Sequence, residues 1–354
     1  MAESLPEVTT SRRARTAGLL SATVIAVVVL LWAKWLPYAG KLPGLAGKHL
    51  WPGSSVLTAG DVHPGAAPSW AAAVSFASAY LNAVLRALVA ALLIAAALQT
   101  LVPRQWLLRL LNRRGRLSSA VAGGLAGTPS MMCTCCTAPV VVSLKRNGVS
   151  TAAAVAYWLG NPLLNPAVIV FLLLVAPWQW TAVRLVVGAL IVVAGAVVVA
   201  WLADGRPDSV PATPVAHEGP PPSLRRYLAA LLRLALTLVP EYVVVVLLIG
   251  AFRGWLFPFD GRFGPVAVTV IVAAVAGTAL VIPTAGEIPI LQGLAVAGLA
   301  TGAVGALLVT LPAVSIPGMV LVWRTLGRRA TVATAAVVMA GGLVAAAALT
   351  LLAR

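Results

Sequence analysis

The amino-acid sequence predicts an all-α polytopic membrane protein with two inverted repeats and an N-terminal anchor helix. The chain is 60% hydrophobic and 10% charged, whereas a soluble domain carries about 25% charged residues. Apolar stretches long enough to cross a bilayer recur along it. Residues 127–148 and 277–298 also match in register at an offset of 150 residues, and such internal repetition sets the architecture of a fold.

The N-terminal region, 1–69, is predicted to be an anchor helix followed by a loop. An apolar helix is expected at 17–36, and the arginines that precede it are typical of the cytoplasmic flank of a signal anchor. Residues 37–69 are rich in Pro and Gly, and we interpret them as an external loop.

The two repeats are predicted to have the same order of elements: a helix, a broken core, a helix interrupted by proline and a last helix. In the first repeat, 70–202, these are expected at 70–102, 117–145, 150–176 and 180–202. In the second repeat, 224–354, they are expected at 226–250, 264–297, 300–322 and 330–352. The Pro-rich polar stretch 203–223 is interpreted as a linker between them.

The distribution of basic residues predicts how the repeats insert. The chain has 25 basic and 9 acidic residues, but the cations cluster at the ends of apolar segments, so the positive-inside rule explains them and no nucleic-acid binding is expected. Loop 104–116 is rich in arginine and its counterpart 253–262 is not, whereas 177–180 is uncharged and its counterpart is basic. This reversal favours opposite orientations, with both broken cores as re-entrant hairpins. Parallel repeats whose cores simply span the membrane are the alternative.

The tips of the two broken cores, near 128–139 and 278–289, are the predicted solute site. Non-helical backbone at membrane depth is tolerated where it is buried in protein or lines a wet cavity, and paired interrupted segments point to a transporter's substrate site. All three cysteines lie in the first tip, and thiolates select soft ions and metalloids. The alternative is that they pack as small apolar residues. The candidate solute-contacting residues are Cys133, Thr134, Cys135, Cys136, Pro139, Asn161, Asn165, Pro283 and Ser315.

Charged residues inside apolar segments are costly and default to functional hypotheses. Glu287 lies at the second tip, Glu241 lies in the helix at 226–250, and Arg86 lies in the helix at 70–102. Either carboxylate is a candidate for a coupling proton, with Arg86 as a counter-charge. The alternative is a buried ion pair with Arg86 that fixes the register of the helices.

Enzyme signatures and cofactor motifs are absent from the sequence. We find no Walker loop, dinucleotide fingerprint or His–Glu metal motif, so the chain is not expected to be an enzyme or to carry a cofactor. A structural zinc site is not expected either, because no histidine is close in sequence to the cysteines.

The segment Cys133-Thr134-Cys135-Cys136, with Pro139 and Leu144-Lys145-Arg146-Asn147-Gly148 after it, resembles a segment of the bacterial predicted permeases, a family that includes the organoarsenical efflux permeases. Glu287-Ile288-Pro289 and residues 311–327 are similar to that family's second repeat. The resemblance covers roughly residues 75–350. Cys136 stands where the family usually has glycine, which adds a thiol, and the second tip has no cysteine.

The resemblance and the cysteines together imply a multi-pass permease of the bacterial inner (cell) membrane. It would export a thiophilic small solute, most concretely a trivalent organoarsenical, by ion-coupled alternating access. A permease for another sulfur compound or a soft metal ion, and a membrane subunit of a larger assembly, are the alternatives. The expected partners are the solute and the lipid bilayer, and an oligomer is compatible with the sequence.

Overall fold

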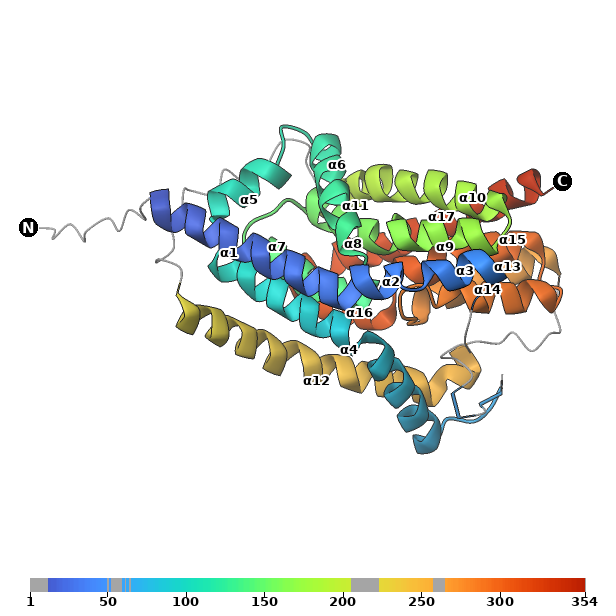
Figure 1. The fold of residues 1–354 in the computed structure, drawn as a ribbon. Coiled ribbons are helices and arrows are strands. Elements are labelled where there is room, and N and C mark those ends of the chain that lie inside the picture. Colours follow the sequence, from blue (N-terminus) through green and yellow to red (C-terminus); the bar gives the residue numbers. More distant parts are fainter. Residues whose placement is uncertain are drawn as a thin grey trace, which may run out of the picture.

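The protein is a bundle of helices, and the computed structural model describes residues 12–49, 51, 59–60, 62–63, 65–204, 223–256 and 265–353. All regular structure in these residues is helical (Figure 1). Within them, six helices are long and apolar enough to cross a membrane, and a bent pair raises this number to seven. The predicted class, an all-α polytopic membrane protein, is confirmed.

The N-terminal segment is more helical than the sequence predicts. Helix α1 (Arg12–Leu30) continues through a π-helical turn, η1 (Leu31–Trp35), into the short helices α2 (Leu36–Ala39) and α3 (Leu42–Lys48). The expectation of a loop from residue 37 is therefore wrong for residues 37–48. Pro37 and Pro43, which suggest a loop, are the second residues of α2 and α3, and proline is tolerated in the first turn of a helix.

The first half of the chain contains one long helix followed by a series of shorter ones. They are α4 (Trp70–Thr100), α5 (Arg104–Leu111), α6 (Arg116–Gly127), the 3-10 turn η3 (Thr128–Ser130), α7 (Thr134–Arg146), α8 (Thr151–Leu163), α9 (Pro166–Val175), α10 (Trp178–Leu190), the π-helical turn η4 (Ile191–Gly195) and α11 (Ala196–Asp204). The linker predicted at 203–223 lies almost wholly outside the described residues.

The second half again begins with a long helix. Its helices are α12 (Leu224–Leu256), α13 (Val266–Ala279), α14 (Glu287–Val296), α15 (Thr301–Ala313), α16 (Ile316–Leu326) and α17 (Arg328–Leu352). Below, α6 and α7 are called the first hairpin, and α13 and α14 the second hairpin.

Helix boundaries repeat at the offset found in the sequence. Helices α6, α8, α9 and α10 begin 150 residues before α13, α15, α16 and α17, respectively. The turns that end α7 and α14 also correspond, because Gly148 and Gly298 both have left-handed backbone, with φ of 86° and 90°. Glycine adopts this conformation without steric cost. The secondary structure is therefore duplicated along with the sequence.

Glycines allow the hairpins to pack closely on the broken helices. A methyl group placed on Gly123 of α6 would lie 2.8 Å from the Cα atom of Ala153 in α8, and one on Gly277 of α13 would lie 3.0 Å from Cβ of Thr310 in α15. Real Cβ atoms essentially never show the first distance, and the second is tighter than nine in ten real Cβ contacts. Each hairpin is thus held against the broken helix of its own half.

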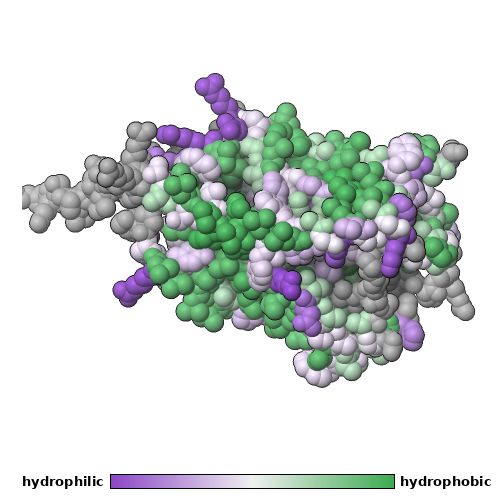
Figure 2. All heavy atoms as spheres, viewed as in Figure 1, coloured by the Kyte–Doolittle hydropathy of each residue, from purple (hydrophilic) through white to green (hydrophobic). Residues whose placement is uncertain are grey.

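The two halves differ at the break in that helix. In the second half, α15 and α16 are bent by 50° relative to each other. In the first half, α8 and α9 together form one membrane-spanning segment, Thr151–Val175, without a bend of this size. The long helices α4 and α12 lie side by side, and α1 packs on α4 (Figure 1). Hydrophobic residues cover much of the outer surface in the view of Figure 2, as expected for helices in contact with lipid.

Candidate functional site

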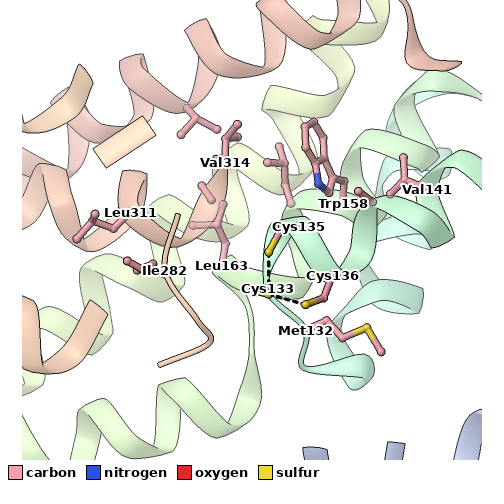
Figure 3. Packing of buried hydrophobic residues seen from close by; sticks show 14 of the residues in the cluster. Met132, Cys133, Cys135, Cys136, Val141, Trp158, Leu163, Ile282, Leu311 and Val314 are labelled. Atoms are coloured by element: carbon pink, nitrogen blue, oxygen red, sulfur yellow. Dashed lines mark hydrogen bonds between the residues drawn. The ribbon is translucent and has the colours of Figure 1, made fainter. Parts of the chain in front are cut away.

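The break between α6 and α7 places the three cysteines together. Met131 has left-handed backbone (φ 52°), and Cys133 is the extended N-cap residue of α7. Cys135 and Cys136 follow in the first turn of the helix, so all three side chains converge (Figure 3). The Sγ atom of Cys133 lies 3.2 Å from that of Cys135 and 3.0 Å from that of Cys136. The three sulfur atoms lie within 4.8 Å of one another, and we call them the sulfur cluster.

The sulfur cluster is buried and is enclosed by both long helices. The three cysteines are at most 5% exposed. Tyr80 of α4 shares a hydrogen bond of 3.0 Å with Cys135 Sγ, and the hydroxyl of Tyr242 in α12 donates to the same atom at 3.4 Å. Pro139, inside α7, has no N–H for the carbonyl of Cys135, four residues earlier. The sulfur of Cys135 therefore has polar contacts from two helices. Its backbone carbonyl does not accept the usual helical hydrogen bond from the residue four positions later.

The donor set of the cluster suits a soft ligand better than a structural zinc ion. Structural zinc sites have four N or S ligands. Within the described part of the chain, no fourth Cys, His, Asp or Glu joins the three thiols. Three thiols beside the phenol of a tyrosine offer soft sulfur ligands, but they lack the fourth ligand that tetrahedral zinc coordination requires.

Four of the predicted site residues bond to the backbone of the broken helices. Thr134 Oγ1 donates to the carbonyl of Pro312 at 2.6 Å, which connects the first tip to α15. Asn161 Nδ2 donates to the carbonyl of Tyr157 in α8 at 2.9 Å, and its Oδ1 accepts a hydrogen bond from the hydroxyl of Ser130 in η3. Asn165 and Ser315 are the N-cap residues of α9 and α16, respectively. These side chains hold the irregular backbone in place, and Asn165 Nδ2 is a buried donor without a partner in the described structure.

Glu287, at the first position of α14, forms an ion pair with Arg184 of α10. Arg184 Nη2 lies 2.9 Å from Glu287 Oε1, and both side chains are almost fully buried. The other carboxylate oxygen, Oε2, has no hydrogen-bond partner in the described structure. The carboxylate of the second tip is therefore neutralised by an arginine from the first half of the chain.

Arg184 also bonds to carbonyls that prolines leave without a helical donor. Proline has no N–H, so Pro166 cannot bond the carbonyl of Pro162, and Pro312 cannot bond that of Leu308. Arg184 donates to both of these oxygens, at 2.8 and 3.0 Å, and to the carbonyl of Leu163 at 3.1 Å. One guanidinium thus satisfies backbone breaks in both halves, as the membrane interior requires.

The other predicted charges do not meet. Glu241 is half-buried in α12 and Arg86 is exposed on α4, and neither forms an ion pair with the other. The alternative of a buried ion pair with Arg86 is therefore not found among the described residues for either carboxylate, and Glu287 pairs with Arg184. Arg86 lines a pocket of about 410 Å³ together with Pro283 of the second tip.

Sequence reasoning missed four polar residues that the structure brings to this region. Lys34 and Arg184 are cations inside apolar segments, which is the signal that identified Glu287. Tyr80 and Tyr242 carry no such signal, because tyrosines are common in membrane helices. Their position beside Cys135 follows from the packing of α4 against α12.

Comparisons with known proteins agree with a transport architecture. A family model described as predicted permease matches residues 69–350. The chain is similar to the UPF0718 protein YraQ of Escherichia coli (strain K12), with 39% identity over 323 residues that cover 90% of this chain and 91% of that protein. No solved structure gave a significant match. Since the matching region contains the repeated helices and the sulfur cluster, the chain belongs to the predicted permease family.

Proposed function

We propose that this permease exports a thiophilic small solute across the bacterial inner (cell) membrane, most concretely a trivalent organoarsenical. The observation that carries the proposal is the sulfur cluster, with three thiols within 4.8 Å of one another at a break between two half-helices. Thiols at such a break contact a ligand that enters between the half-helices, and soft sulfur prefers soft metalloids to hard ions.

The chemistry of binding requires two thiols and no redox partner. A monosubstituted organoarsenical in water carries two hydroxyl groups on As(III). Two As–O bonds break and two As–S bonds form, and each thiol proton leaves with a hydroxide as water. Cys133 is the natural common ligand because its sulfur is close to both Cys135 and Cys136. Hydrolysis reverses the two bonds, so the solute can be released on the other side.

A soft metal ion is the second candidate solute. Three thiols match the preference of Cu(I) and similar ions for sulfur ligands, and the described residues offer such a three-thiol group. A different small sulfur compound, or a role as a membrane subunit of a larger assembly, would leave the cysteines as packing residues.

Transport is proposed to proceed by alternating access between two inverted repeats. The duplicated helix boundaries support the repeats, and the reversed bias of Lys and Arg supports their opposite orientation. Glu287 is the proposed site of ion coupling. Its carboxylate is buried, and its Oε2 atom is free to take a proton in a state in which Arg184 has withdrawn.

Tolerance assays in arsenic-sensitive cells test the solute. Expression of the wild type should raise tolerance to methylarsenite or to an aromatic arsenical. Cys133→Ala should abolish this effect, since loss of one As–S bond weakens binding by at least about tenfold. Met132→Leu is the matched control, because Met132 is buried beside the cluster and contributes no thiol. Unchanged tolerance with a well-expressed wild type would reject the arsenical, and uptake of Cu(I) or Ag(I) into vesicles would then be measured.

A further inference from the structure

A pocket of about 410 Å³ lies between the N-terminal segment, α4 and the tip of the second hairpin. The N-terminal segment contributes Lys34 and Lys41, and α4 contributes Arg86. The second tip contributes Pro283, Thr284 and Gly286. Three parts of the chain that are far apart in sequence therefore build one cavity.

The charge of this pocket is one-sided. Three of its lining residues are cations, and no carboxylate lines it among the residues that the structure describes. The sulfur cluster does not line it either. In a membrane protein, cations that face a cavity without acidic partners attract an anion, because charge in a low-dielectric region is stable only when it is compensated.

Lys34 is the most buried of the three cations, at 6% exposure. Its ammonium donates to the hydroxyls of Tyr38 and Thr284, each at 3.1 Å, and the described structure gives it no carboxylate partner. It lies in the π-helical turn η1, and such turns occur frequently at functional sites. The ammonium is thus held by two neutral groups at the wall of the pocket.

One further feature favours an anion at this position, and another connects it to the first tip. Gly286 is the N-cap residue of α14, so the positive end of a ten-residue helix meets the pocket. The turn η1 also contacts the first tip, because the indole N–H of Trp35, the residue after Lys34, donates to the carbonyl of Pro129 in η3 at 2.9 Å. The turn that carries Lys34 is therefore bonded to both tips, to the second through Thr284 and to the first through Pro129.

We propose that this pocket binds the anionic oxygen group of the transported solute, and that the solute carries a carboxylate or a similar oxyanion in addition to its thiophilic atom. The inference rests on the proposed function in taking the solute to reach the cysteines. The cations of Lys34, Lys41 and Arg86 hold the anionic end, and the thiophilic end extends past Lys34 to the sulfur cluster. The family model matches from residue 69 onward, so Lys34 and Lys41 belong to a segment that precedes it. This N-terminal segment thereby contributes to solute selection.

Calorimetric titration of the purified full-length protein in detergent tests this assignment with two probes that differ in one group. Phenylarsonous acid is neutral, and 4-carboxyphenylarsonous acid adds a carboxylate. The wild type should bind the carboxylate probe about tenfold more tightly, which corresponds to about 1.4 kcal/mol. Arg86→Gln and Lys34→Met should remove this preference and leave the affinity for the neutral probe unchanged. Arg86 is exposed, so its variant should fold even if the Lys34 variant does not.

The matched control is Lys48→Met, which removes a cation of the same N-terminal segment outside the pocket and should keep the preference. Equal affinity of the wild type for the two arsenicals, with binding lost in Cys133→Ala, would overturn the anion site and leave the proposed function standing. Titration with benzoate tests the case in which the anion site exists but the protein does not bind arsenicals. Benzoate binding that disappears in Arg86→Gln supports the anion site even if neither arsenical binds, and no benzoate binding together with no carboxylate preference overturns it.

Discussion

Arg184 performs two tasks with one side chain. Its guanidinium donates to the carbonyls of Pro162 and Leu308, one in each half of the chain, and it forms an ion pair with Glu287. Breaking a buried pair by removing one partner leaves an uncompensated charge, at a cost of about 3–5 kcal/mol. The ion pair and the proline breaks are thus coupled, so a change in the charge of Glu287 is transmitted directly to the irregular backbone.

Glu287→Gln should abolish proton-driven export and leave solute binding largely intact. Glutamine keeps an oxygen for Arg184 but does not exchange a proton, so the coupling step is lost. Because the variant also leaves the buried guanidinium without its counter-charge, its expression and solute binding are measured alongside export. The measurement is export into everted vesicles as a function of pH, with a loss of at least about tenfold expected. Glu241→Gln is the control, since Glu241 is half-buried and has no ion pair in the described structure. A Glu287→Gln protein that still pumps with the same pH dependence would make Glu287 a structural partner of Arg184.

At this scale the sequence locates the candidate residues but not their neighbours. The clustering of three cysteines at a Gly/Pro-broken core identifies the first tip, and a carboxylate in an apolar segment identifies Glu287. The partners of these groups come from distant positions: Lys34 contacts Thr284, 250 residues away, and Arg184 contacts Glu287, 103 residues away. Local patterns carry no information about which distant helix faces a tip, so the sequence does not identify Arg184 as the partner of Glu287.

The contact between α6 and α8 depends on the absence of a side chain at Gly123. Gly123→Ala would drive a methyl group into the backbone of Ala153 and should destabilise the protein by about 1–3 kcal/mol. Gly293→Ala in α14 is the matched control, because nothing lies within 4 Å of the added methyl group. It should be neutral or slightly stabilising, since alanine is the better helix former. Thermal unfolding in detergent measures both, and equal melting temperatures for the two variants would contradict the close packing.

The sequence predicts the proline breaks of the repeats, but it expects a loop at 104–116, where the structure has helix α5 (Arg104–Leu111), and it predicts the segment before the repeats poorly. In the repeats, prolines and glycines recur at a fixed offset, and the breaks at 164–165 and 314–315 follow from them. Before the repeats, Pro37 and Pro43 suggest a loop, but each occupies the first turn of a helix. Proline ends one helix and begins another with equal ease, and composition alone does not distinguish these roles.

Membrane topology is the property of the whole molecule on which the transport proposal depends. Arg146 and Val296 occupy equivalent exposed positions near the ends of α7 and α14. Single cysteines at these two positions should react with a membrane-impermeant maleimide from opposite faces of the membrane. The native cysteines are buried and provide a low background, which the unsubstituted protein measures as a control. Labelling of both positions from the same face would establish parallel repeats and remove the basis for inverted insertion.

The 50° bend between α15 and α16 has a consequence for the transport cycle, because the equivalent helices α8 and α9 lack a bend of this size. The two copies of one motif therefore have different shapes in the same structure, as the proposed alternating access requires of a state that is open to one side. Under the proposed inverted topology, an exchange of the two shapes would correspond to a two-fold rotation of the repeats about an axis in the membrane plane. The passage would then close on one face of the membrane and open on the other. The difference in bend between the two copies would therefore determine which face is open.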